Sequence, residues 1–309
     1  MKKYLILLAK IIVFALAALV IMMLLMIPFA FSGLVNVTNP ERWAILAIEA
    51  IQLIAVLLAA WLIIHYWDEL PFVENMGFSI QGRGKDILCG LGVAAAIYAV
   101  GFIVSLLAGW VSVEKVQFDL NYLLLQFVFY IFVALVEESA MRGFVLGHML
   151  DVGMNKHLAL VLSAFLFACL HLSNAGMSNF ALFNLTLAGV LLGATYIYTR
   201  NLWFPISLHL FWNYIQGPIL GYEVSGNGGS NTLLVLRDSE NTLMNGGEFG
   251  FEASLPCTIL MLIAIGLIIY WFETKKKEHE ETVVVLDESA NDDIVYDIRG
   301  NEDGGTEGN

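Results

Sequence analysis

The chain has 309 residues, of which 59% are hydrophobic and only 14% are charged. A soluble globular domain carries roughly 45 to 50% apolar and about 25% charged residues, so the composition excludes that class and predicts an integral membrane protein. The formal charge of −13 comes mainly from residues 273–309, which hold 12 acidic and 4 basic side chains. Residues 1–272 carry no basic patch, so we expect no nucleic acid among the partners.

The apolar segments are long enough to cross a bilayer repeatedly, because a hydrocarbon core about 30 Å thick takes about 20 helical residues. We expect an all-α fold, a polytopic membrane helix bundle with about eight transmembrane helices in residues 1–272. An acidic tail at 273–309 is expected to be disordered and cytoplasmic. The expected spans are 4–31, 43–67, 87–110, 122–150, 157–174, 178–199, 202–222 and 254–272.

The first span has some features of a signal peptide, since two lysines precede it and Ala15-Leu16-Ala17 resembles a cleavage box. Its apolar run continues to Phe31, well beyond a typical signal-peptide core, which favours a retained helix. With the N-terminus inside, nine lysines and arginines flank the inner ends of the spans and three flank the outer ends. The positive-inside rule therefore predicts that both termini are cytoplasmic.

The fourth span contains three charged residues within six positions, Glu137, Glu138 and Arg142. Each charge is expected to have a compensating partner or a function, because a charge at the centre of a spanning helix costs about 2.5 to 3.5 kcal/mol on insertion. Glu138 and Arg142 are four residues apart with the acid first, the favourable order for a helical ion pair, whereas Glu137 points about 100° away. We expect Glu138 and Arg142 to pair, and Glu137 to face a cavity as a candidate general base. The alternative is that all three residues only lock helix packing.

Two histidines and an asparagine on other spans carry the remaining candidate chemistry. His171 lies near the end of the fifth span, while His209 and Asn213 are four residues apart in the seventh and share one helical face. A single membrane histidine is more often an interhelical hydrogen-bond partner than a catalyst. In this topology His171 falls near the outer end of its helix while Glu137 and His209 lie near mid-membrane, so that helix must tilt, begin later, or have shifted boundaries.

Other polar and small residues are expected to have structural roles. Glu49 and Gln52 should face the bundle or the outer interface, and Asn184 should be an interhelical hydrogen-bond partner. The Gly-rich loop 223–253 is expected to pack on the membrane domain. Small-residue pairs allow close helix approach, and cysteines without CxxC spacing are expected to be small core residues. The small-residue pairs are Gly143 with Gly147 and Gly189 with Gly193, and the cysteines are Cys89, Cys169 and Cys257.

Three ordered motifs resemble those of the CPBP family, the CAAX prenyl endopeptidases and bacteriocin-processing proteins also called Abi proteins. The motifs are Glu137-Glu138-x-x-x-Arg142-Gly143, Phe167-x-x-x-His171 and His209-x-x-x-Asn213. The likeness covers residues 122–222 in order and spacing. Asn201-Leu202-Trp203 also looks typical of the family, and Gly246 to Glu252 resembles a stretch found after the motifs in many bacterial members.

The resemblance implies an intramembrane endopeptidase. It implies that Glu137 activates water with help from His171, that His209 and Asn213 form an oxyanion hole, and that Glu138 and Arg142 support them. The implied partners are the lipid bilayer and a peptide or protein substrate, with lipid-modified chain ends among the candidates. We expect no cofactor. Zinc is the alternative, since two histidines and a glutamate could bind it, although no His-Glu-x-x-His motif is present.

Two other functional classes compete with the protease. One is a non-catalytic membrane adaptor or regulator that binds a sensor kinase or a secretion partner, a role that the acidic tail fits without requiring it. The other is a transporter with a glutamate proton relay, which the lack of an inverted repeat makes less favourable.

Overall fold

The computed structural model describes residues 2–32, 42–229 and 231–275, so the predicted disorder of the acidic tail lies outside the described residues. The chain divides into a compact unit of residues 1–265 and a second unit of residues 266–309. The longer helices are α1 (Lys2–Ser32), α2 (Arg42–Tyr66), α4 (Gly84–Leu107), α5 (Leu120–Glu138), α7 (Lys156–Cys169), α8 (Asn179–Gly193), α10 (Trp203–Tyr214) and Leu255–Lys275.

Shorter helical segments connect or extend the long helices. The α-helical ones are α3 (Phe72–Met76), α6 (Gly147–Asp151), α9 (Tyr196–Thr199) and α11 (Thr242–Asn245). Two π-helical segments, η1 (Ser139–Leu146) and η2 (Ile215–Ile219), continue α5 and α10, and two 3₁₀ turns are η3 (Gly247–Phe249) and η4 (Phe251–Ala253).

The predicted all-α membrane bundle is confirmed, and the lengths of its helices refine the predicted spans. In the described part of the chain, six helices are long and apolar enough to cross a membrane. The other two expected spans correspond to α7 and to α10 with η2. Because α7 has 14 residues, it is only about 21 Å long, shorter than a hydrocarbon core of about 30 Å.

The predicted span 157–174 is therefore too long at its C-terminal end. The helix ends at Cys169, and His171 lies in the turn that follows it. The prediction places His171 at a different membrane depth from Glu137 and His209 because it treats α7 as a helix that crosses the whole bilayer. With 14 residues, α7 is too short to do so.

A two-stranded antiparallel sheet was not predicted. Strand β1 (Val111–Val116) pairs with β2 (Leu234–Asp238), with an irregularity between Val113 and Lys115. Each strand is short and lies in a loop, and the partners are more than 100 residues apart in the chain, so local pattern gave no signal for their pairing. As expected, the loop 223–253 packs against the membrane domain, since Phe249 and Phe251 are almost fully buried.

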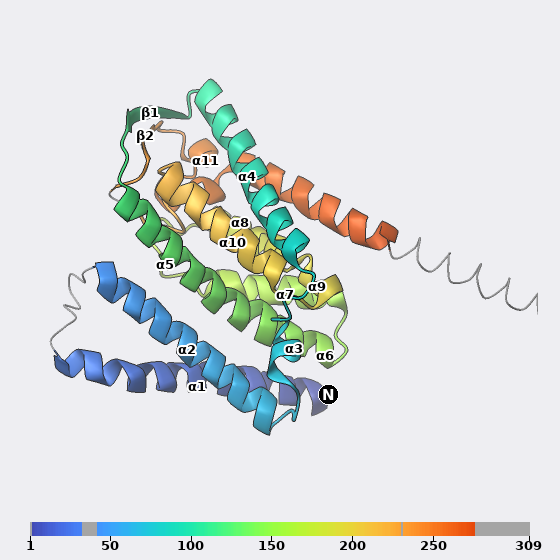
Figure 1. Cartoon of the computed structure of the whole chain (residues 1–309). Coiled ribbons are helices and arrows are strands. Elements are labelled where there is room, and N and C mark those ends of the chain that lie inside the picture. Colours follow the sequence, from blue (N-terminus) through green and yellow to red (C-terminus); the bar gives the residue numbers. More distant parts are fainter. Residues whose placement is uncertain (1, 33–41, 230, 276–309) are drawn as a thin grey trace, which may run out of the picture. The chain divides into compact units, whose positions relative to one another are not determined.

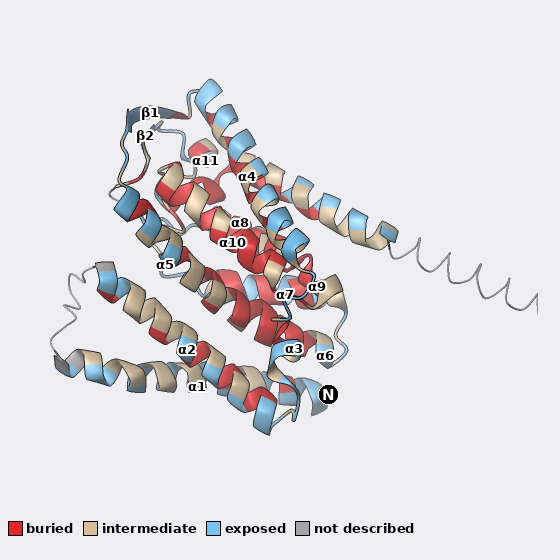
Figure 2. Ribbon diagram, in the orientation of Figure 1, coloured by how far each residue is buried: buried red, intermediate tan, exposed pale blue. Residues whose placement is uncertain are grey.

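Within residues 1–265 the helices pack in the order α1, α2, α5, α10 and α4, and α7 packs with α8 beside them (Figure 1). Figure 2 shows that burial is concentrated along α10, whereas few residues of α1 are buried. A Cβ atom on Gly90 of α4 would lie 2.7 Å from the backbone nitrogen of Leu208, so α4 and α10 approach closely only because this position is glycine.

Side chains fix the beginnings of the helices that carry the motifs. Asp119 accepts a hydrogen bond from the backbone N–H of Tyr122 at 3.0 Å and caps α5, and Asn155 caps α7 in the same way. The Asn201-Leu202-Trp203 segment precedes α10. Its asparagine donates to the Ser79 carbonyl at 2.8 Å and its indole N–H donates to the Phe78 carbonyl at 3.0 Å. These bonds fix where α10 enters the bundle.

Candidate active site

A cavity of about 610 Å³ lies among α2, α5, α7, α8 and α10, and side chains of all three motifs line it. Glu137, His171, His209 and Asn213, the four predicted catalytic residues, all contribute to its wall. Glu138 and Arg142 do not line it and are almost completely buried behind it. The four residues come from α5, the turn after α7, and α10, and they are brought together as expected.

The helix that carries the acidic motif changes its winding directly after the two glutamates. Residues up to Glu138 are α-helical, and η1 begins at Ser139. The wider π turn shifts the following side chains around the axis, and such segments are frequent at functional sites. Helix α10 changes in the same way, passing into η2 just after Asn213, where Pro218 also removes a backbone donor.

Glu138 forms the predicted buried pair with Arg142, and it also contacts His209. Its Oε1 accepts a hydrogen bond from Arg142 at 2.8 Å and lies 2.8 Å from His209 Nδ1. The second guanidinium nitrogen donates to the Gly189 carbonyl at 3.0 Å, and the guanidinium lies 4.6 Å from the centre of the Phe167 ring. A carboxylate only accepts, so it holds the proton of His209 on Nδ1 and directs Nε2 toward the cavity.

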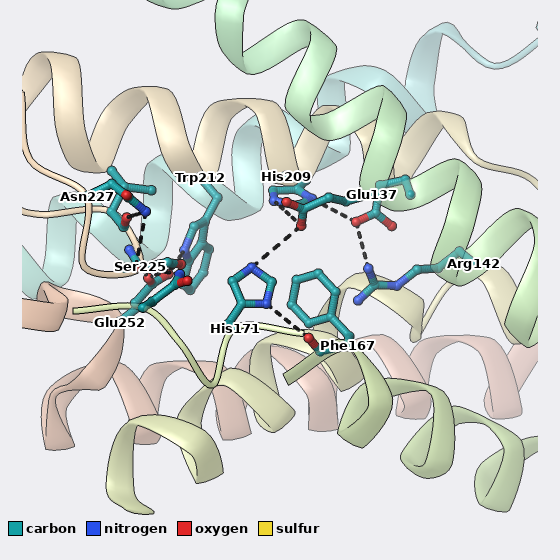
Figure 3. A network of polar contacts seen from close by, with 12 residues as sticks. Glu137, Arg142, Phe167, His171, His209, Trp212, Ser225, Asn227 and Glu252 are labelled. Atoms are coloured by element: carbon teal, nitrogen blue, oxygen red, sulfur yellow. Dashed lines mark hydrogen bonds and ion pairs between the residues drawn. The ribbon is translucent and has the colours of Figure 1, made fainter. Parts of the chain in front are cut away.

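Glu137 lies between the two histidines at distances too long for direct hydrogen bonds. Its Oε2 is 3.9 Å from His171 Nε2 and 3.8 Å from His209 Nε2 (Figure 3). That oxygen is buried and makes no hydrogen bond, although the side chain as a whole keeps 29% of its surface exposed, against 0% for Glu138. The two neighbouring acids therefore divide as predicted: one is in the cavity and the other is behind it.

His171 is oriented by the backbone of the last turn of α7, the helix that precedes it. Its Nδ1 lies 3.0 Å from the Phe167 carbonyl oxygen, four residues earlier. A carbonyl oxygen is an acceptor only, so Nδ1 carries the proton and Nε2 faces Glu137. The Phe167-x-x-x-His171 motif thus has a local reason: the backbone of the first residue fixes the imidazole of the last.

Glu252 lines the same cavity and was missed as an individual site residue. Its carboxylate accepts from the Ser225 backbone N–H at 2.5 Å, from Ser225 Oγ at 2.6 Å and from Trp212 Nε1 at 3.2 Å (Figure 3). Burial raises the pKa of Glu252, and these hydrogen bonds and the nearby His171 act in the opposite direction. The resemblance around Gly246 to Glu252 was the available signal, but the sequence did not show that this loop reaches the motif helices.

The loop is tied to the bundle beside the cavity. Asn184 donates to the backbone carbonyls of Glu252 at 2.9 Å and Ser254 at 3.0 Å. Its side-chain oxygen accepts a hydrogen bond from Thr258 of the last helix at 2.7 Å, as its predicted interhelical role requires. Asn174, three residues after His171, donates to the Ser225 carbonyl at 2.8 Å. The Gly-rich loop therefore forms part of the cavity wall and contacts the turn that carries the second motif.

Residues given structural roles from sequence have mixed outcomes. Glu49 and Gln52 face the bundle, where both line the cavity. Among the cysteines only Cys257 is a core residue as predicted, because Cys89 is exposed on the side of α4 and Cys169 is half-buried. Within the described ranges, no group of three or more His, Cys, Asp or Glu side chains is arranged to hold a metal ion.

The fold and the site together define a polytopic membrane protein with an acid, two imidazoles and an amide around one internal cavity. Residues 119–215, which contain all three motifs, match the family model described as type II CAAX prenyl endopeptidase Rce1-like. This match supports the motif resemblance to the CPBP/CAAX proteases, a family of peptide-bond hydrolases. No curated protein and no solved structure matches the chain.

Proposed function

We propose that this protease hydrolyses peptide bonds within the membrane by a metal-free mechanism in which Glu137 activates water. The observation that carries the proposal is the unpaired Glu137 Oε2, held 3.9 and 3.8 Å from two imidazole nitrogens. A gap of this size is too long for a direct hydrogen bond, and a water molecule in the cavity beside it can contact the carboxylate and an imidazole together.

In the first step Glu137 removes a proton from water while His171 Nε2 orients it, and the hydroxide adds to the carbonyl carbon of the substrate. Negative charge then develops on the carbonyl oxygen. His209 Nε2–H and the Asn213 amide, which lie four residues apart on α10 and both line the cavity, then donate hydrogen bonds to that oxygen. The proton held by Glu137 passes to the leaving amine as the carbon–nitrogen bond breaks, which regenerates the carboxylate.

Glu138 and Arg142 support this cycle without touching substrate. His209 must carry protons on both ring nitrogens to donate from Nε2 while Nδ1 binds Glu138. The carboxylate at 2.8 Å favours that charged form. Arg142 in turn balances the buried charge of Glu138. We assign the pair a positioning role.

The test is a Glu137→Gln variant, which keeps the size and hydrogen bonding of the side chain but removes the base. Cleavage of a peptide that the wild-type chain processes should fall by a factor of about 100 or more. A Glu74→Gln variant, which changes an exposed glutamate of α3 outside the cavity, is the matched control. Full processing by Glu137→Gln would reject the role assigned to this carboxylate.

Metal dependence has a separate test. We expect 1,10-phenanthroline to leave cleavage unchanged, because hydrolysis in this proposal uses only protein side chains. Loss of activity with the chelator, restored by zinc alone, would support the zinc alternative instead.

The substrate is proposed to be a peptide or protein segment that reaches the cavity in the bilayer, with lipid-modified chain ends among the candidates. Both termini of the chain are proposed to be cytoplasmic. Reporter fusions at residues 1 and 309 test the topology. The hypothesis of a non-catalytic membrane adaptor is not favoured, since the family model that matches describes a protease.

A further inference from the structure

Helix α2 carries two polar side chains that face the catalytic cavity. Between Arg42 and His65 its side chains are apolar except for those of Glu49 and Gln52. These two residues are three positions apart, so they share one face of the helix, and both line the cavity. A polar side chain within a spanning helix normally has a partner in the protein, because the lipid offers none.

Neither side chain has such a hydrogen-bond partner. In the described part of the chain, Glu49 and Gln52 form no hydrogen bond and no ion pair, and both are only half-buried, so their polar atoms are open to the cavity. Gln216 in η2 shows how a glutamine joins elements of this bundle. It accepts from the Tyr98 hydroxyl and donates to the Glu223 carbonyl at 2.5 Å. Gln52 makes no contact of this kind, so helix packing does not account for it.

Gln52 is the amide that the cavity leaves available. The amide side chains of the described wall are those of Gln52, Asn174, Asn213 and Asn227. Asn174 and Asn227 donate to the Ser225 carbonyl at 2.8 and 3.3 Å. Asn213 is assigned to the oxyanion in the proposed mechanism. Gln52 therefore retains a donor and an acceptor for a molecule that enters the cavity.

A peptide substrate supplies the matching groups. The bond that is cleaved must lie in an extended segment, whose N–H and C=O groups lack helical partners, and leaving them unpaired in a poorly hydrated space is costly. A carboxamide can donate to one atom of the peptide main chain and accept from another. Helices α2 and α10 both pack on α5 (Figure 1). A segment whose carbonyl meets His209 and Asn213 can therefore pass Glu137 and reach α2.

We propose that Gln52 is a substrate-binding residue that hydrogen-bonds the peptide main chain beside the cleaved bond. The inference rests on the proposed function of the cavity and deepens it: α10 binds the carbonyl that is attacked, and α2 binds the adjacent main chain. Glu49 is less suitable for a test, because its carboxylate is electrostatically coupled to that of Glu137 and its removal would also affect the base. Replacing Gln52 changes no charge in the cavity.

The first experiment measures kcat and KM for the full chain in lipid nanodiscs, with an apolar peptide of about 20 residues that the wild-type chain cleaves. Gln52→Met keeps the length of the side chain and removes its amide. We expect KM to rise about tenfold and kcat to stay within about twofold, because the lost bond is already made when the substrate binds. Gln81→Met, which changes an exposed glutamine outside the cavity, should alter neither constant.

The second experiment locates the bond on the substrate. In a series of peptides one main-chain N–H at a time is replaced by an ester oxygen, and the cleaved bond itself stays an amide. With the wild-type chain, one replacement close to the cleaved bond should lower kcat/KM about tenfold. With Gln52→Met the same replacement should lower it by less than about twofold, because the partner of that group is already gone. The ratio is measured within each variant, so a loss of folded protein does not mimic the effect.

The outcomes separate the two proposals. An unchanged KM in Gln52→Met, or ester effects that are equal in the wild type and the variant at every position, would overturn the inference and leave the proposed function standing. Full processing by Glu137→Gln would reject the proposed base, whereas the role of Gln52 is judged by KM and the ester series. No cleavage of any peptide by the wild-type chain would overturn both.

Discussion

Replacing Arg142 with methionine tests whether the buried ion pair holds the motif helices together. The substitution removes the 2.8 Å bond to Glu138, the 3.0 Å bond to the Gly189 carbonyl and the contact with the Phe167 ring. Breaking a buried pair by removing one partner costs about 3 to 5 kcal/mol, because the other charge is left uncompensated. His209 still lies 2.8 Å from Glu138 Oε1, so we place the loss at the lower end, about 3 kcal/mol.

The measurement is reversible unfolding in mixed micelles, followed by the fluorescence of the seven tryptophans. A loss of about 3 kcal/mol raises the unfolding equilibrium constant by more than about 100-fold. The double variant Glu138→Gln with Arg142→Met keeps an acceptor for His209 and removes the buried charge. It should recover about 2 kcal/mol relative to Arg142→Met alone. The reasoning fails if the single variant costs under about 1 kcal/mol, or if the double variant is the less stable of the two.

Two further predictions concern packing and pH. Gly189→Ala should destabilise the bundle by about 1 to 3 kcal/mol in the same assay, because the added Cβ would lie 2.8 Å from the Cβ of Ala164. Gly92→Ala, which meets nothing within 4 Å, should be neutral or stabilising; equal losses in both would contradict this account. Burial raises the pKa of Glu252, so the native state holds its proton more tightly than the unfolded state. Stability should therefore fall as pH rises from the range of an unfolded glutamate through the native pKa, and Glu252→Gln should flatten that slope.

The candidate chemistry was largely predictable from the sequence, because the bilayer makes buried charge conspicuous. Glu137, Glu138 and Arg142 stood out in an apolar span, and helical periodicity separated the paired acid from the acid in the cavity. The same reasoning overextended the helix before His171, since an apolar run does not reveal where a short helix ends inside the bundle.

The contacts that join distant segments were decided only by the tertiary structure. Glu138 orients His209 across 71 residues of chain, and Glu252 reaches the cavity through Ser225 and Trp212. The tertiary structure also decided the pairing of β1 with β2 and the position of Glu49 on the cavity wall. Hydropathy and spacing determine which segments are buried in lipid and which faces are polar, because these depend on neighbours within one helix. Which polar faces meet depends on the packing of whole helices, and no local pattern contains that information.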